Sequence, residues 1–463
     1  MLTLSDAILQ EEISGVQQLL HYRCEEINQL DPYGFTPLIE AAIVDNIEIS
    51  RLLLTQGADP NQQDVTGGTA LQWAAENHNQ VLCQLLLDHQ ANPNAYNFAG
   101  QPVLVMPTLR RQAAIRQCLI KGGADPLFAQ DYINVKLLGH LFELVGTANI
   151  VSPNNQFVEV DFEGFFLEVT TGLITNSLVE FQNHYAARQL RRYAGMVHYI
   201  VEALQRASEL IKYQQYRTDL KKQQKQINAL IEQEPLVIPV GYEGHAITFI
   251  KLGNILVKCD RREDSRLYDN VMLYYVKNMK ALTTNFIKSL IFEKQPSEFI
   301  NNELPDILGL EPLTELKVAS QISGNCSWAN VEAVIPALFF LLLIPVSKDD
   351  QSHAYHKTLA LSFFQRWREW NKERALQFCI QSYQEGDSLR KACKAEILAA
   401  VLFQSCRFDT QDNIARSEAI LSVLLGSPYE YVLKNYVRVY YYEHNRPEGR
   451  RFFELLKARG MKM

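Results

Sequence analysis

The chain contains 463 residues, of which 47% are hydrophobic and 21% are charged. These values are typical of a globular protein with more than one domain, and they exclude an intrinsically disordered chain. The formal net charge of −7 provides no overall basic surface, so we expect no direct binding to nucleic acid.

The cysteines and the apolar segments restrict the setting in which the chain works. The eight cysteines are far apart and form no closely spaced pairs, which favours a reducing compartment over a disulfide framework. The N-terminus lacks a basic segment followed by an apolar one, so we expect no cleaved signal peptide. The longest apolar run, residues 333–346, contains two prolines and is too short to cross a bilayer. It predicts a buried core helix, and we expect no membrane span.

Residues 1–130 repeat with a period of 33. The stretch 31–38 (DPYGFTPL) resembles the signature of the ankyrin family, which implies units of a β-turn and two short helices. We expect a capping unit at 1–30, two regular units at 31–64 and 65–97, and a degenerate unit at 98–130. Stacked units form the core that no single unit can form alone. The positions in phase are Gly34, Gly67 and Gly100; Leu53, Leu86 and Leu119; Ala58, Ala91 and Ala124; and Pro60, Pro93 and Pro126.

Pro107 occupies a position where the first helix of the fourth unit would carry alanine, so we expect that helix to be short. The ankyrin resemblance implies that the array binds a protein. The alternative is a purely structural array that orients the rest of the chain.

The remainder of the chain divides into three parts. Residues 131–234 predict a mixed and then helical connecting region. Residues 235–346 carry strand signals at 236–240, 245–252, 255–259 and 271–276, and Gly253-Asn254 between two of these runs predicts a tight hairpin. Residues 347–463 predict a C-terminal helical region.

Cys326 is the candidate nucleophile. Gly324 and Asn325 predict a turn, and an apolar helix follows, so Cys326 should lie at a helix N-terminus. Unpaired N–H groups and the positive end of the helix dipole stabilise a thiolate there. The backbone N–H of Cys326 and the side-chain amide of Gln321 are the candidate oxyanion donors.

His245 and Asp260 are the candidate base and its orienting carboxylate. His245 begins one predicted strand and Asp260 follows the next, so the hairpin should bring them together. Asn254, Glu263 and Asp264 remain alternative partners for the histidine. Taken singly, these residue types are more often a buried thiol, a turn histidine and a surface carboxylate; the hypothesis depends on their combined order.

The chain order His245, Asp260, Gln321, Cys326 resembles the adenain and ubiquitin-like-protein protease clan, whereas papain-type enzymes place the cysteine first. The resemblance covers about residues 235–346 and implies an α+β cysteine-protease-like core that cleaves peptide or isopeptide bonds. Two positions depart from the clan's pattern. Ala246 follows the histidine where tryptophan is usual, and Gln321 is one residue closer to the cysteine.

The combination of ankyrin units with such a module resembles the Ankyrin H family of effectors from Legionella-type intracellular bacteria. That resemblance implies translocation from the bacterium into a host cell, with action in the cytoplasm or nucleus, on a host protein or a ubiquitin-like substrate. The predicted fold is a multidomain α + (α+β) protein, with an N-terminal ankyrin solenoid, a papain/adenain-like core with a helical insertion, and a C-terminal helical bundle. The alternatives are a non-catalytic interaction protein with a vestigial module and a thiol-dependent acyltransferase. No cofactor or metal site is expected, because the helical pair His353 and His356 has no acidic or cysteine partner nearby.

Overall fold

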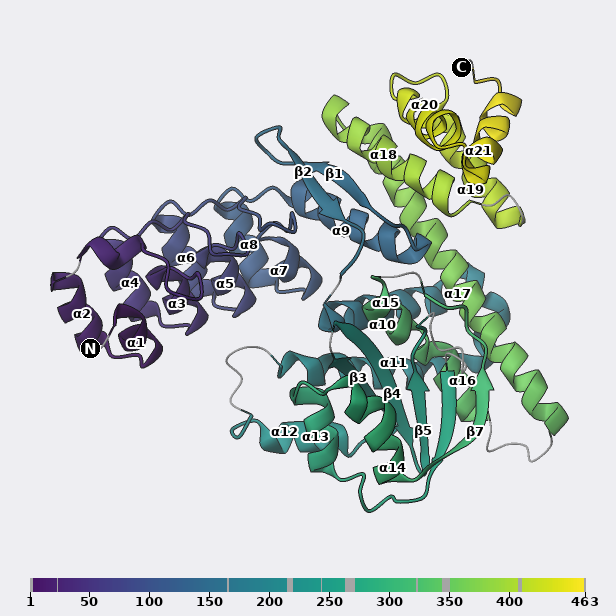
Figure 1. Cartoon of the computed structure of the whole chain (residues 1–463), viewed down its shortest axis with the longest axis horizontal. Helices are drawn as coiled ribbons and strands as arrows, with labels where there is room; N and C mark the ends of the chain where they lie inside the picture. Colours follow the sequence, from purple (N-terminus) through teal and green to yellow (C-terminus); the bar gives the residue numbers. More distant parts are fainter. Residues whose placement is uncertain are drawn as a thin grey trace.

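The computed structural model describes residues 3–22, 24–164, 166–214, 220–242, 244–262, 271–321, 324–343, 350–406 and 410–461. An elongated array of short helices leads into a mixed module built on a five-stranded sheet, and a long helix connects this module to the C-terminal helices (Figure 1).

The array consists of stacked antiparallel helix pairs, which confirms the predicted ankyrin repeats. Asp31 accepts hydrogen bonds from the backbone N–H groups of Tyr33 and Phe35 and shapes the turn, and Thr36 caps the helix that follows. Gly34 has φ +85, and a Cβ there would lie 2.0 Å from Val65 Cγ1 in the next unit, so the stacking requires glycine. The helices are α1 (Leu4–Leu9), α2 (Ile13–Tyr22), α3 (Pro37–Ile43), α4 (Ile47–Thr55), α5 (Ala70–Glu76), α6 (Gln80–Asp88), α7 (Val105–Leu109) and α8 (Ala113–Lys121), with a 3₁₀ turn η1 (Cys24–Asn28).

Helix α7 has only five residues and contains Pro107, as the sequence predicted. The next helix, α9 (Pro126–Phe142), begins with Asp125 as its cap and runs through the boundary expected at residue 130. Most of α9 is buried, because the hairpin of β1 (Thr147–Val151) and β2 (Phe157–Asp161) packs on it. The array therefore continues into the next part of the chain through a shared helix.

The connecting region is mainly helical. Helices α10 and α11 form an antiparallel pair that packs behind the sheet, and α11 contacts its first strand (Figure 1). The elements are α10 (Leu167–Asn183), η2 (Tyr185–Tyr193), α11 (Ala194–Lys212) and α12 (Gln224–Ile231).

The sheet is antiparallel, with its strands in sequence order. Side chains alternate along each strand, and the two faces enter separate apolar clusters: Ile238 and Phe249 face one, Val237 and Ile250 the other. The four strands predicted from the sequence are present, whereas the edge strand β7 was not predicted. The elements are β3 (Leu236–Tyr242), β4 (His245–Leu252), β5 (Ile255–Cys259), β6 (Val271–Val276), α13 (Thr284–Phe292), η3 (Phe299–Glu303), α14 (Leu304–Leu308) and β7 (Leu310–Leu316).

Two short helices, α15 (Cys326–Glu332) and α16 (Val334–Leu343), pack against β4 and form the most apolar part of the core. The segment Cys326–Leu343 is long and apolar enough to cross a membrane, but 83% of it is buried within the protein. It behaves as the predicted core helix.

The C-terminal part is helical, as predicted. Its long first helix α17 contacts α9, α10, α16 and α18, so it joins the array side of the molecule to the sheet module. The elements are α17 (Asp350–Glu385), α18 (Ser388–Gln404), α19 (Gln411–Leu424), α20 (Tyr431–Val437), η5 (Arg438–Glu443) and α21 (Pro447–Ala458).

A buried charge cluster lies where these parts meet. Arg261 is fully buried and pairs with Glu332 at 2.6 Å, and Arg368 of α17 lies 3.4 Å from the same carboxylate. Both arginines also contact Glu143, at the end of α9, at 3.5 and 3.1 Å. These charges neutralise one another at a site where Arg261 and Glu332 are fully buried and Arg368 and Glu143 are partly exposed.

We predict that Glu332→Ala lowers the free energy of unfolding by about 3–5 kcal/mol, because it leaves two arginines with too little compensating charge. Chemical denaturation monitored by circular dichroism measures this. Glu311→Ala breaks an exposed pair with Lys277 and should cost less than about 1 kcal/mol. Equal losses for the two variants would contradict a stabilising role for the cluster.

Candidate active site

The structure brings Cys326, His245 and Asp260 together. Cys326 is the first residue of α15, His245 is the first residue of β4, and Asp260 directly follows β5. The register of β4 against β5 places the start of one strand beside the end of the other, with Thr248 opposite Cys259. His245 Nε2 lies 3.0 Å from Asp260 Oδ1.

The hydrogen bond to Asp260 fixes the orientation of the histidine ring. A carboxylate accepts, so Nε2 carries the proton and Nδ1 remains for the thiol of Cys326, with which His245 also interacts. Tyr242 packs edge-on against the imidazole, with ring centroids 5.5 Å apart. The ring is therefore held from two sides in a position to exchange a proton with the sulfur.

The electrostatics favour an ion pair between thiolate and imidazolium. Burial alone would raise the pKa of the Cys326 thiol, but hydrogen bonds from His245 and from the backbone N–H of Ala246 outweigh it and lower that pKa. Burial likewise opposes protonation of His245, yet its bonds to Asp260 and Cys326 raise its pKa. Burial would raise the pKa of Asp260, whereas His245 and Lys258 hold it below its usual range.

At the other cysteines whose side chains the structure describes, burial outweighs any hydrogen bond to the sulfur and raises the pKa. Burial raises the pKa of Cys83 and Cys393 to about 12 and of Cys379 to about 11. Cys326 is also only partly buried, so a reagent can reach it. Low pKa and access are the two properties that distinguish a reactive thiol from a structural one.

Of the three alternative partners for His245, the structure describes only Asn254. Asn254 lies in the turn at the opposite end of β4, roughly 20 Å away at the rise of an extended strand, so it is the wrong residue to orient the ring. Glu263 and Asp264 lie outside the described residues.

Gln321 approaches the site through its backbone. Its N–H donates to the carbonyl of Arg261 at 2.9 Å, which ties this loop to the residue that follows Asp260. Its side chain is buried and is not part of the cavity lining, and within the described ranges its Oε1 has no hydrogen-bond partner. Its role as an oxyanion donor stays a prediction.

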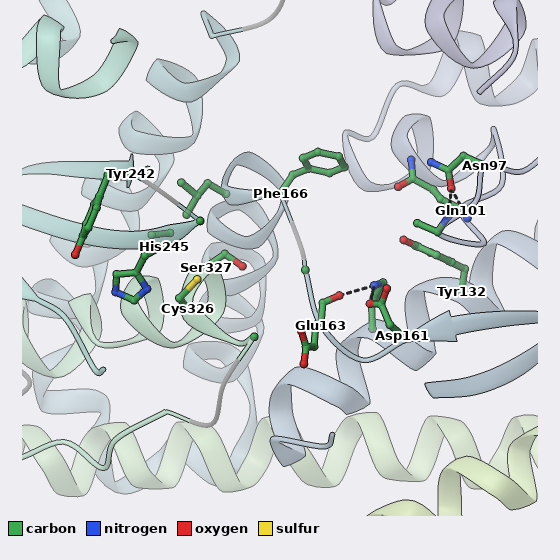
Figure 2. A pocket seen from close by; sticks show the side chains of 18 of the residues that line it. Asn97, Gln101, Tyr132, Asp161, Glu163, Phe166, Tyr242, His245, Cys326 and Ser327 are labelled. Carbon is green, nitrogen blue, oxygen red and sulfur yellow. Dashed lines mark hydrogen bonds and ion pairs between the residues drawn. The ribbon is translucent and has the colours of Figure 1, made fainter. Parts of the chain in front are cut away.

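Cys326 lines a cavity of about 800 Å³, and the two walls of this cavity come from different parts of the chain. Figure 2 shows Tyr242, His245, Cys326 and Ser327 on one side, and side chains from the array and from the β1–β2 region on the other. The facing wall is formed by Asn97, Gln101, Tyr132, Lys136, Asp161 and Glu163, with Phe166 at its edge.

This facing wall was not predicted from the sequence. Its members lie in the third ankyrin turn, in α9 and after β2, and no local pattern links them to residues 245 or 326. Gly324 is one sign that the facing wall lies close to the segment before Cys326, because a Cβ there would lie 2.2 Å from the Glu163 side chain. A buried lysine is a second sign, since Lys136 pairs with Asp161 and is only 2% exposed.

A direct link also runs from α9 to the residue before the nucleophile. His140 Nδ1 lies 2.6 Å from Asn325 Oδ1, and Asn325 Nδ2 donates to the carbonyl of His140 at 3.3 Å. The His140 ring stacks on Trp328 with centroids 5.6 Å apart. The end of the ankyrin stack thus holds the first turn of α15 in place.

Among the described residues, no group of three or more His, Cys, Asp or Glu side chains could hold a metal ion.

Comparisons with known proteins agree with the architecture. The family model for ankyrin repeats, in three copies, matches residues 4–97. The solved structure of the Legionella effector AnkH is similar over 99% of this chain and 98% of its own, with a TM-score of 0.87 and 37% sequence identity. No curated protein matches the chain significantly.

We predict that iodoacetamide alkylates Cys326 with a pH midpoint below the ~8.5 of an ordinary thiol, because the reagent attacks the thiolate. His245→Ala removes the hydrogen bond that lowers the thiol pKa, so its rate at pH 6 should fall at least about tenfold, as a shift of one pKa unit requires. Mass spectrometry of the modified peptide measures the rate at this cysteine alone. His198→Ala removes an exposed histidine of α11 and should leave the profile unchanged. A wild-type midpoint near 8.5 would contradict the activated thiol.

Proposed function

This chain belongs to the family of the Legionella effector AnkH, and from that premise we propose that it is a host-directed effector whose Cys326 hydrolyses peptide or isopeptide bonds. The observation that carries the proposal is the contact of His245 with both Asp260 and Cys326 at the mouth of an open cavity. By the same family relationship, we propose that the protein is translocated into a host cell and acts in its cytoplasm or nucleus.

The proposed reaction has two steps. In the first, the Cys326 thiolate attacks the carbonyl carbon, and the tetrahedral intermediate collapses to a thioester as the His245 imidazolium protonates the departing amine. In the second, His245 takes a proton from water, which attacks the thioester, and the thiol leaves with the carboxylic acid as the second product. Asp260 keeps its charge throughout and stabilises the imidazolium.

The oxyanion would be bound at the start of α15. The backbone N–H of Cys326 lies in the first helical turn, where amide groups have no intrahelical acceptor. Gln321 is the proposed second donor, and it would have to turn its side chain from the buried position towards the cavity when substrate binds.

The ankyrin array has two roles in this proposal. Its exposed turns bind a host protein, as repeats of this kind do, and its third turn contributes Asn97 and Gln101 to the wall that faces Cys326. A substrate segment would then lie between the array and the sheet module. Binding by the array and cleavage at Cys326 would then take place on one continuous surface of the protein.

A non-catalytic interaction protein is the second candidate, and the position of Gln321 favours it. With that side chain outside the cavity lining, the backbone N–H of Cys326 is the one oxyanion donor that we assign among the described residues, where a complete oxyanion hole has at least two. Ala246, beside the base, likewise stands where the resembling clan usually has tryptophan, so that bulky side chain is missing from the cavity wall.

Electrophilic probes derived from ubiquitin and ubiquitin-like proteins separate the two candidates. We expect wild-type protein to form a covalent adduct, and Cys326→Ala and His245→Ala to form none, because the adduct requires an activated thiolate. Intact-protein mass spectrometry measures the adduct. The hydrolase proposal fails if no probe reacts and iodoacetamide modifies Cys326 no faster than an ordinary thiol.

The facing wall can be tested with a peptide-based chloromethyl ketone. Phe166 is 61% exposed at the edge of the cavity, and we predict that Phe166→Ala slows labelling by the peptide reagent about fivefold while the iodoacetamide rate is unchanged. Phe157 is 57% exposed but lies outside this cavity, so Phe157→Ala is the matched control and should not affect either reagent. Equal effects of the two variants would show that the peptide does not use this wall.

A further inference from the structure

Asn330 contacts the backbone next to each of the other two residues of the site. It lies on α15 one turn after Cys326, and it is only 1% exposed. Its Nδ2 donates to the carbonyl of Ala246 at 2.5 Å, and its Oδ1 accepts from the N–H of Arg261 at 2.7 Å. Ala246 directly follows His245, and Arg261 directly follows Asp260.

The backbone of Ala246 thus runs along two successive turns of α15. Its N–H interacts with the Cys326 sulfur, and its carbonyl accepts from the Asn330 amide. The first contact stabilises the thiolate. The second fixes the position of the same peptide segment along the axis of α15. A shift of β4 along α15 would break both.

The segment after Asp260 is held just as closely. The Arg261 N–H has Asn330 as its acceptor, and the guanidinium donates to the carbonyls of Ala319 and Ala329 and to Glu332. Asn330 and Glu332, both on α15, therefore fix the backbone and the side chain of Arg261. Asp260 has little freedom to move away from His245.

The chemistry of these contacts requires a primary amide. One side must present an acceptor to a backbone N–H and the other a donor to a backbone carbonyl, in one plane and over a short distance. An aliphatic side chain would leave both backbone groups unpaired in a buried region. Neither contact reaches a substrate, so the residue acts through His245 and Asp260.

We propose that Asn330 is a positioning residue that holds His245 and Asp260 in register with Cys326 on a single helix. The inference rests on the proposed function, because it concerns the same three groups. It adds that the placement of His245 and Asp260 relative to Cys326 depends on the buried side-chain amide of Asn330, which lies outside the cavity. The residue's effect should therefore appear in the acid–base behaviour of the site as well as in stability.

The test is the pH profile of Cys326 alkylation by iodoacetamide in the full-length protein. Asn330→Ala and the bulkier Asn330→Leu should each move the midpoint upwards towards that of an ordinary thiol and slow the reaction at pH 6 about tenfold. Asn371 is also buried, at 3% exposure, but lies on α17 and does not line the cavity. Asn371→Ala should lower the melting temperature without changing the profile.

A double-mutant cycle distinguishes positioning from general destabilisation. If Asn330 acts through His245, the double variant Asn330→Ala, His245→Ala should react about as slowly as His245→Ala alone. Additive losses, or a wild-type profile in both Asn330 variants, would overturn the inference while leaving the thiol hydrolase proposal in place. An ordinary profile in the wild-type protein would overturn both.

Discussion

A largely buried charge cluster joins the separate parts of the molecule at its centre. Arg261, Glu332, Arg368 and Glu143 come from four segments that are distant in sequence: the end of the β5 strand, the nucleophile helix, the long α17 and the end of the array helix α9. Each charge is tolerated in the interior only because its partners are present. The four charges can therefore compensate one another only when the array, the sheet module and the C-terminal helices are packed together.

The same requirement explains how the ankyrin array reaches the candidate active site. Repeat proteins are usually quasi-one-dimensional, with each unit contacting its neighbours alone. Here the stack ends in α9, whose His140 binds Asn325 and whose terminal Glu143 joins the charge cluster. The array is thus anchored on both sides of the nucleophile helix, and its third turn becomes a wall of the cavity. A partner bound to the array would lie against a surface that is rigidly connected to Cys326.

The sequence predicted those parts of the structure that have local signals. The 33-residue period gave the array, Pro107 the short helix, and Gly253-Asn254 the hairpin that pairs His245 with Asp260. The strand β7 was missed because Leu310–Leu316 is a largely exposed edge strand with a proline, so it lacks the alternation of a half-buried strand. The facing wall, Asn330 and the charge cluster were missed because they arise from contacts between distant segments, for which a single sequence gives no sign.

Two histidines flank the start of α15, and their surroundings give them opposite chemistry. His140 is buried against Trp328 with an amide as its Nδ1 partner, and burial lowers its pKa to about 4, so it stays neutral and serves as a fixed link between the array and Asn325. His245 is also partly buried, but a carboxylate and a thiol compensate for the burial and raise its pKa. Protonation of His245 is therefore stabilised at low pH and lost as the pH rises through its raised pKa, whereas the thiolate is lost only when the pH falls below the lowered pKa of Cys326. Both shifts favour the charged pair, and His245, unlike His140, can supply the proton that an amine leaving group requires.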